Sequence, residues 1–105
     1  MNNIGIITCF NESKVCSSYG CFKAFNDRNA SFKNYGLNSE IICFTHCNGC
    51  SDNSLEQMLH RATQMKNRGV DTIHISTCIK INCKMYDDFI EILSKEFNII
   101  GYTHD

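Results

Sequence analysis

The sequence predicts an α/β fold, a three-layer sandwich in which helices cover about four parallel strands. The alternation of two kinds of segment along the chain predicts this fold. Short runs of β-branched and apolar residues alternate along the chain with longer segments of helical periodicity. This alternation is typical of βαβ units with right-handed crossovers. The length of 105 residues leaves room for one domain, so we expect a single unit over residues 1–105.

Four segments are predicted as strands. Residues 4–8 form a short apolar run, which indicates a strand buried on both faces of a sheet. Three further runs rich in β-branched and apolar residues follow at intervals along the chain, at 40–45, 72–77 and 98–102. Together they predict the four strands of the sheet.

Helical periodicity fills the intervals between these strands. Aromatic residues recur at helical spacing over residues 19–35, before Gly36. The clearest helix starts at Ser54, which is expected to cap it, and ends before Gly69. A third helix is expected over 85–97. The second helix has one apolar stripe, formed by Leu55, Met58, Leu59, Ala62 and Met65.

Strand and helix in strict alternation predict an open sheet like a truncated flavodoxin-like or Rossmann-like fold. In such sheets ligands bind at the carboxyl ends of the strands, where the loops lead into the helices. We therefore expect the functional residues at this edge, which we call the C-terminal rim.

Composition and charge exclude several classes of function. Apolar residues make up 43% of the chain, enough for a folded core. The net charge is -1 and no run of Lys or Arg is present, so we expect no nucleic-acid partner. The longest apolar runs are far too short to span a membrane, and no signal peptide is visible at the N-terminus. A cytoplasmic location is expected.

Eight cysteines in 105 residues are the unusual feature of this chain. In a short secreted protein such a density would predict a disulfide framework. Without an export signal, and with enough strand and helix pattern to fold unaided, the cysteines instead indicate metal binding or redox chemistry.

The predicted fold gathers most of these cysteines at the C-terminal rim. Cys43, inside the second strand, is the exception, and we expect it to pack as a small apolar residue. The others follow strands or lie in the loops behind them, together with two histidines: Cys9, Cys16, Cys21, His46, Cys47, Cys50, Cys78, Cys83 and His104. One thiolate-rich site is therefore predicted at this rim.

The sequence Cys47-Asn48-Gly49-Cys50 is a C-x-x-C motif, whose spacing lets two thiolates bind one tetrahedral metal ion. Crowded thiolates repel one another, and a bound cation resolves this repulsion by keeping them deprotonated. We expect the metal ligands to be Cys9, Cys47, Cys50 and Cys78, with Cys16, Cys21, Cys83 and His104 as further candidates.

The sequence resembles the CGGC-domain family of small prokaryotic proteins, over essentially the whole chain. The resemblance rests on IGIITC at 4–9, CSSYGCFK at 16–23, THCNGC at 45–50, GVDTIHISTC at 69–78 and GYTH at 101–104. Asn48 stands where the family motif has its first glycine, and asparagine tolerates a left-handed backbone better than most residues. The resemblance implies metal binding, and it implicates Cys9, Cys16, Cys21, Cys47, Cys50, Cys78, Cys83 and His104.

Three interpretations stay open. The protein could hold zinc or an iron–sulfur cluster, because thiolates suit both. It could instead be a thiol–disulfide or iron–sulfur redox protein in which Cys47 and Cys50 react, with Cys47 as the attacking thiol. The metal could also be purely structural, in a module that binds a protein partner or forms a homodimer. No enzymatic reaction is identifiable.

The positions of the remaining two histidines predict their environments. His60 lies on the polar side of its helix and is expected at the surface, whereas His74 is expected as a hydrogen-bonded core histidine.

A phosphatase loop after the first strand would require an arginine six residues beyond Cys9, where Val15 stands. That class of enzyme is excluded.

Overall fold

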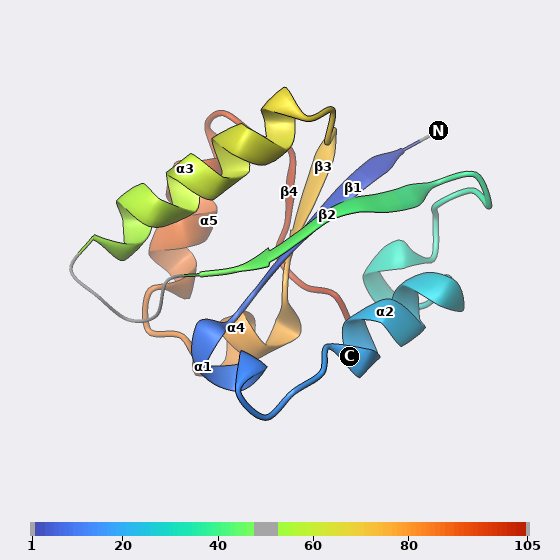
Figure 1. The fold of residues 1–105 in the computed structure, drawn as a ribbon, viewed down its shortest axis with the longest axis horizontal. Helices are drawn as coiled ribbons and strands as arrows, with labels where there is room; N and C mark the ends of the chain where they lie inside the picture. The colour runs from blue at the N-terminus through green and yellow to red at the C-terminus, as the bar shows by residue number, and fades with distance from the viewer. Residues whose placement is uncertain (1, 48–52, 105) are drawn as a thin grey trace.

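The computed structural model describes residues 2–47 and 53–104. Within these residues the chain forms a four-stranded, fully parallel sheet in the order β2-β1-β3-β4 (Figure 1). The strands are β1 (Asn3–Thr8), β2 (Glu40–His46), β3 (Thr72–Ile75) and β4 (Ile99–Ile100). The predicted α/β class with about four parallel strands is confirmed.

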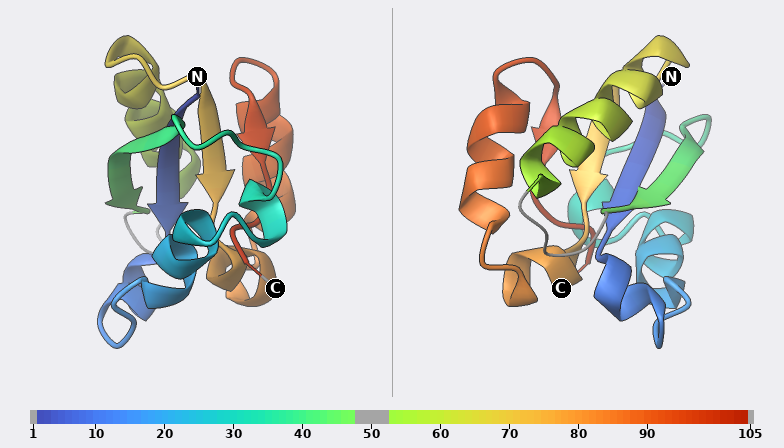
Figure 2. Two further views of the ribbon diagram at one scale, coloured as in Figure 1. Left: turned by 90° about the vertical axis from the view of Figure 1, so that its right-hand side faces the viewer. Right: turned by 60° about the vertical axis from the view of Figure 1, so that its left-hand side comes forward.

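Helices cover both faces of this sheet, which gives the three predicted layers (Figure 2). One face packs against α2 (Tyr19–Asn26) and the 3-10 helix η1 (Ala30–Phe32), and the other against α3 (Ser54–Asn67) and α5 (Tyr86–Ser94). Two short helices, α1 (Phe10–Ser13) and α4 (Thr77–Asn82), follow β1 and β3 directly. None of the helices in the described part of the chain has the length and apolarity of a membrane span.

The central strand β1 separates two apolar cores. Ile4 and Ile6 are fully buried against α2 and η1, whereas Ile7 is fully buried against the core under α3 and α5. Both faces of the strand are therefore covered, as its continuous apolar run predicts.

A β-bulge in β2 changes the face to which its side chains point. Ile4 pairs with Ile41, but Gly5 pairs with Cys43, so that one residue of β2 is left without a partner in the register. Ile41 consequently packs with the core under α2, and Cys43 with the core under α3. Cys43 thus packs as a small apolar residue, as the sequence predicts.

The prediction of one helix over 19–35 is wrong. Helix α2 ends at Asn26, because Arg28 and Ala30 adopt left-handed backbone angles, with φ of 54° and 51°. A left-handed residue cannot continue a right-handed helix, and the chain resumes as the short η1. The aromatic spacing nonetheless marks a buried surface, since Phe25 and Phe32 lie in the same core.

Several element boundaries also differ from the prediction. Strand β3 ends at Ile75 instead of Thr77, because the chain turns into α4 there. Helix α3 starts at Ser54 with Asn53 in the cap position, so Ser54 is not the cap. The helix expected over 85–97 covers Tyr86–Ser94, and the strand expected over 98–102 is reduced to Ile99–Ile100. The stripe of α3 is confirmed, with Met58, Ala62 and Met65 buried.

Candidate functional site

The topology defines where a ligand is expected to bind. From β1 the chain crosses one face of the sheet to reach β2, and the later crossovers run over the other face to β3 and β4 (Figure 2). The order of the strands therefore reverses between β1 and β3. In open α/β sheets, the crevice at the carboxyl ends of two such strands is the usual ligand site. Cys9 follows β1 at this point, and Cys78 follows β3.

A small cavity at this crevice is lined by four thiols and an imidazole. Its volume is about 40 Å³, and we call it the His104 cavity. Its potential metal ligands come from the ends of β1 and β3, from α1, from the loop before α2, from α2 itself and from the C-terminal segment: Cys9, Glu12, Cys16, Cys21, Cys78 and His104.

Two of these thiols are held by hydroxyl groups. The Cys78 Sγ lies 2.9 Å from Ser76 Oγ, and the Cys21 Sγ lies 3.3 Å from Thr103 Oγ1. Burial raises the pKa of the Cys21 thiol, and nearby negative charge on Cys78 and Cys16 would raise it further, although the Thr103 contact lowers it in part. Burial and neighbouring thiolates thus favour the protonated form of Cys21, which a bound cation would reverse.

The C-terminal segment brings His104 to the cavity through Thr77 at the start of α4. Thr77 Oγ1 accepts hydrogen bonds from the backbone N–H of Thr103 at 3.1 Å and of His104 at 2.9 Å. The Thr77 N–H in turn donates to Thr103 Oγ1 at 3.2 Å. Thr103 is fully buried, so the segment is anchored one residue before His104.

Gly20 on α2 makes room for the His104 ring. A Cβ atom at this position would lie 3.1 Å from His104 Nε2 and 3.2 Å from Cδ2. These distances are tighter than ordinary van der Waals contact, so a Cβ at this position would require the imidazole to shift by a few tenths of an ångström.

Cys16 is the most exposed of the thiols at this cavity. It lies in the loop between α1 and α2, where its Sγ accepts a hydrogen bond of 3.3 Å from the Ser18 N–H. Ser18 adopts a left-handed conformation with φ of 66°, which turns the chain into α2. The loop therefore directs this cysteine toward the cavity without burying it.

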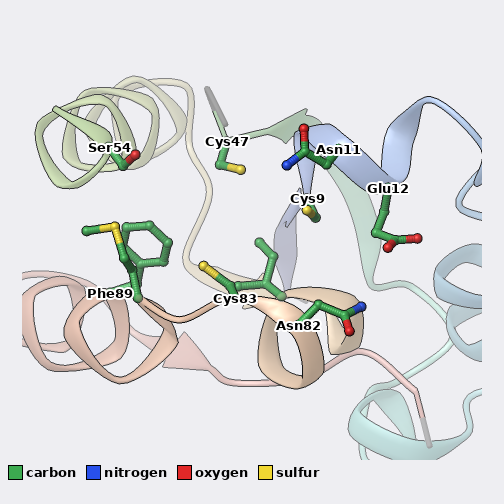
Figure 3. Close-up of a pocket in the computed structure, with 10 residues that line it drawn as sticks. Cys9, Asn11, Glu12, Cys47, Ser54, Asn82, Cys83 and Phe89 are labelled. Carbon is green, nitrogen blue, oxygen red and sulfur yellow. The ribbon is translucent and has the colours of Figure 1, made fainter. Parts of the chain in front are cut away.

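A second, larger cavity adjoins the first on the side of α3 and α5. It measures about 180 Å³, and we call it the Cys47 cavity. Cys9, Cys47 and Cys83 line it from the ends of β1, β2 and α4 (Figure 3). Apolar side chains close its other side, among them Ile79, Met85 and Phe89.

Cys47 is bound closely to the strand beside it. It is only 6% exposed, and its Sγ accepts a hydrogen bond of 3.4 Å from the Phe10 N–H. Its own N–H donates to the Thr8 carbonyl at 2.9 Å, which extends the pairing of β1 and β2. The Cys47 sulfur thus accepts a hydrogen bond from the Phe10 N–H, a backbone donor that would otherwise continue the pairing of β1 and β2.

The structure distributes the predicted ligands over both cavities. Of the expected inner set, Cys47 lines one cavity, Cys78 the other and Cys9 both, while Cys50 lies outside the described residues. Cys16, Cys21 and His104 join Cys78, and Cys83 joins Cys47. In residues 2–47 and 53–104, no three Cys, His, Asp or Glu side chains are arranged to hold a metal ion.

Sequence reasoning missed Glu12, which lines both cavities. It follows Cys9 at i+3, a spacing that brings two residues to one face of a helix. Predicting the short helix α1 after β1 would have placed them together.

The other three histidines lie outside both cavities. His74 on β3 is fully buried, with Tyr35 Oη at 2.8 Å from Nε2 and the Tyr102 carbonyl at 3.1 Å from Nδ1. Burial lowers its pKa from 6.5 to about 4. The prediction of a hydrogen-bonded core histidine is confirmed. His60 is exposed on α3, as predicted, and His46 stacks at 5.1 Å from the Phe10 ring.

Fold and site together define a cysteine-rich α/β protein in which the described thiols, except that of Cys43 within β2, lie toward the C-terminal rim of an open parallel sheet. The sequence model of the CGGC domain matches residues 3–104, and the chain belongs to this family. A search of curated proteins and a search of solved structures found no match.

Proposed function

We propose that this protein binds a zinc ion in the His104 cavity, through the thiolates of Cys16, Cys21 and Cys78 and the imidazole of His104. The supporting observation is the cavity itself, which four thiols and an imidazole line at the crevice between β1 and β3. Three cysteines and one histidine are a ligand set that zinc commonly takes in proteins.

The size of the cavity favours a single ion over a cluster. A volume of about 40 Å³ compares with roughly 10–15 Å³ for one water molecule by the same kind of measure. A single zinc ion needs little space beyond its ligand atoms, whereas an iron–sulfur cluster brings several iron and sulfide atoms. Cys9 is left out of the proposed set because it also lines the Cys47 cavity, beside Cys47.

Binding requires the ligands to draw together. The donors line one cavity, but in the described part of the chain no three of them converge on a metal position. Cys16, on an exposed loop, has the most freedom to move inward. Zinc binding would also release the proton of Cys21, whose pKa burial raises.

A redox function at the Cys47 cavity is the second candidate. It is supported by the N–H···S hydrogen bond from Phe10, because a hydrogen bond to sulfur stabilises a thiolate or a cluster ligand. Cys50, which completes the C-x-x-C motif in the sequence, would be the second reacting thiol or a cluster ligand.

Metal analysis of protein purified under anaerobic conditions tests the zinc proposal. Wild-type protein and Cys43→Ser are expected to hold about one zinc ion per chain, and Cys21→Ser and Cys78→Ser are expected to lose it. Cys43 is the matched control, because it lies on β2 outside both cavities. Circular dichroism checks that each variant is folded.

Two results would overturn the zinc proposal. Unchanged zinc content in both Cys21→Ser and Cys78→Ser would exclude the His104 cavity. Iron and sulfide in place of zinc, with visible charge-transfer absorption, would show a cluster instead.

A further inference from the structure

Cys9 and Cys47 occupy matching positions on neighbouring strands. The pairing of β1 with β2 ends at Thr8 and His46, and each cysteine is the residue that directly follows its strand. The hydrogen bond from the Cys47 N–H to the Thr8 carbonyl continues the ladder past this pair. Cys9 itself has extended backbone angles, φ −78° and ψ 128°, so the strand geometry still holds at its position.

The strand spacing at this pair is compatible with a disulfide, although both cysteines are free thiols in this structure. Paired strands lie roughly 4.8 Å apart, and disulfides join Cα atoms about 4.4–6.8 Å apart. Both side chains pack with the core under α3 and line the same cavity (Figure 3). The Cys47 Sγ is already 3.4 Å from the Phe10 nitrogen, an atom of the peptide bond that follows Cys9.

We propose that Cys9 and Cys47 are a redox couple that forms a reversible disulfide across the ends of β1 and β2. The oxidant is a low-molecular-weight disulfide such as oxidised glutathione. Oxidation joins the two sulfur atoms and cleaves the disulfide of the oxidant, whose two halves leave as thiols with the two protons and two electrons of the cysteines.

Burial determines the order of the two exchange steps. Cys9 is half-buried at the junction of the two cavities, whereas Cys47 is only 6% exposed. Cys9 therefore attacks the oxidant first and forms a mixed disulfide, and Cys47 then displaces the second thiol. This reverses the order that the C-x-x-C motif suggests, in which Cys47 attacks first.

Two other described cysteines that pack with this pair, Cys43 and Cys83, are less suited as partners. Cys43 lies on β2, which ends just before Cys47, but the residue opposite it on β1 is Gly5. Cys83 lines the same cavity from the end of α4, which has no ladder to hold it opposite either strand. The pair shares no residue with the proposed zinc ligands, so each of the two proposals can fail without the other.

Disulfide mapping after oxidation tests this inference. Wild-type protein is incubated with oxidised glutathione, its remaining thiols are blocked, and its peptides are analysed by mass spectrometry before and after reduction. We expect a peptide that joins Cys9 to Cys47 and disappears on reduction, with loss of two thiols per chain. Cys43→Ser is expected to lose two thiols as well, whereas Cys9→Ser is expected to form no such disulfide.

A Cys47–Cys50 link in the wild type, or an unchanged loss of two thiols in Cys9→Ser, would overturn the inference. The inference would also be overturned if Cys9 and Cys47 remained free thiols after oxidation, or if they formed only mixed disulfides with glutathione. If circular dichroism shows that Cys9→Ser is unfolded, the disulfide mapping of the wild-type protein alone decides whether the Cys9–Cys47 disulfide forms. Zinc content, measured in the same samples, reports on the metal proposal separately.

Discussion

Replacing His74 by glutamine is expected to remove a pH-dependent part of the free energy of unfolding. The His74 side chain is fully buried, and its pKa is lowered from 6.5 to about 4 by burial. Between these values the folded protein keeps a neutral imidazole while the unfolded chain binds a proton. Stability is therefore fully present above pH 6.5 and is lost as the pH falls toward 4.

The size of this effect follows from the shift in pKa. A change from 6.5 to about 4 is about 2.5 units, and each unit corresponds to about 1.4 kcal/mol. Since the folded protein itself begins to bind the proton near pH 4, the expected loss by that pH is about 3 kcal/mol. This is a large part of the stability of a protein of this size.

Urea denaturation at about pH 7 and about pH 4 measures this loss, with chelator and reductant present so that neither metal nor disulfide contributes. The decrease should be smaller by about 3 kcal/mol in His74→Gln than in the wild type. His60→Gln is the matched control, because His60 is exposed on α3 and should leave the decrease unchanged. An equal decrease in His74→Gln and wild type would refute the reasoning.

Three further substitutions test individual contacts. Gly20→Ala would bring a Cβ within 3.1 Å of His104 Nε2 and is expected to weaken zinc binding about 10-fold in a competition titration with a chelator; unchanged affinity would contradict the close packing of Gly20 against a ligating imidazole. Tyr35→Phe removes the 2.8 Å hydrogen bond to His74 and should lower the free energy of unfolding by about 1 kcal/mol in urea; an unchanged value would show that the bond is not formed. Met58→Ala, at a fully buried position, should cost about 2–5 kcal/mol in the same assay, and a cost under about 1 kcal/mol would contradict the packing described here.

The fold could be predicted where one face or both faces of an element are buried along its whole length. The continuous apolar run of residues 4–8 indicates a strand buried on both faces, and the stripe on α3 gives a clear helical period. Helices α1 and α4 have four and six residues, too few to show a helical period. The break after α2 depends on left-handed angles at Arg28 and Ala30, neither of which is a residue type that favours that conformation.

The site could be predicted at the level of the sheet but not of the cavity. Parallel strands bring their carboxyl ends to one rim, which is why Cys9, Cys47 and Cys78 could be grouped from the sequence. Their division between two cavities depends on the turns that α1 and α4 make after β1 and β3, and those helices were not predicted. The Thr103 contacts that fix the C-terminal segment join residues 26 positions apart and follow no local pattern.

X-ray absorption at the zinc edge of the metal-loaded protein tests the central claim most directly. Three sulfur ligands at about 2.3 Å and one nitrogen at about 2.0 Å are predicted, from Cys16, Cys21, Cys78 and His104. In His104→Ala the nitrogen contribution of the imidazole should disappear while the sulfur contribution stays. A zinc ion bound by four sulfur atoms in the wild type, or by oxygen and nitrogen alone, would contradict the account.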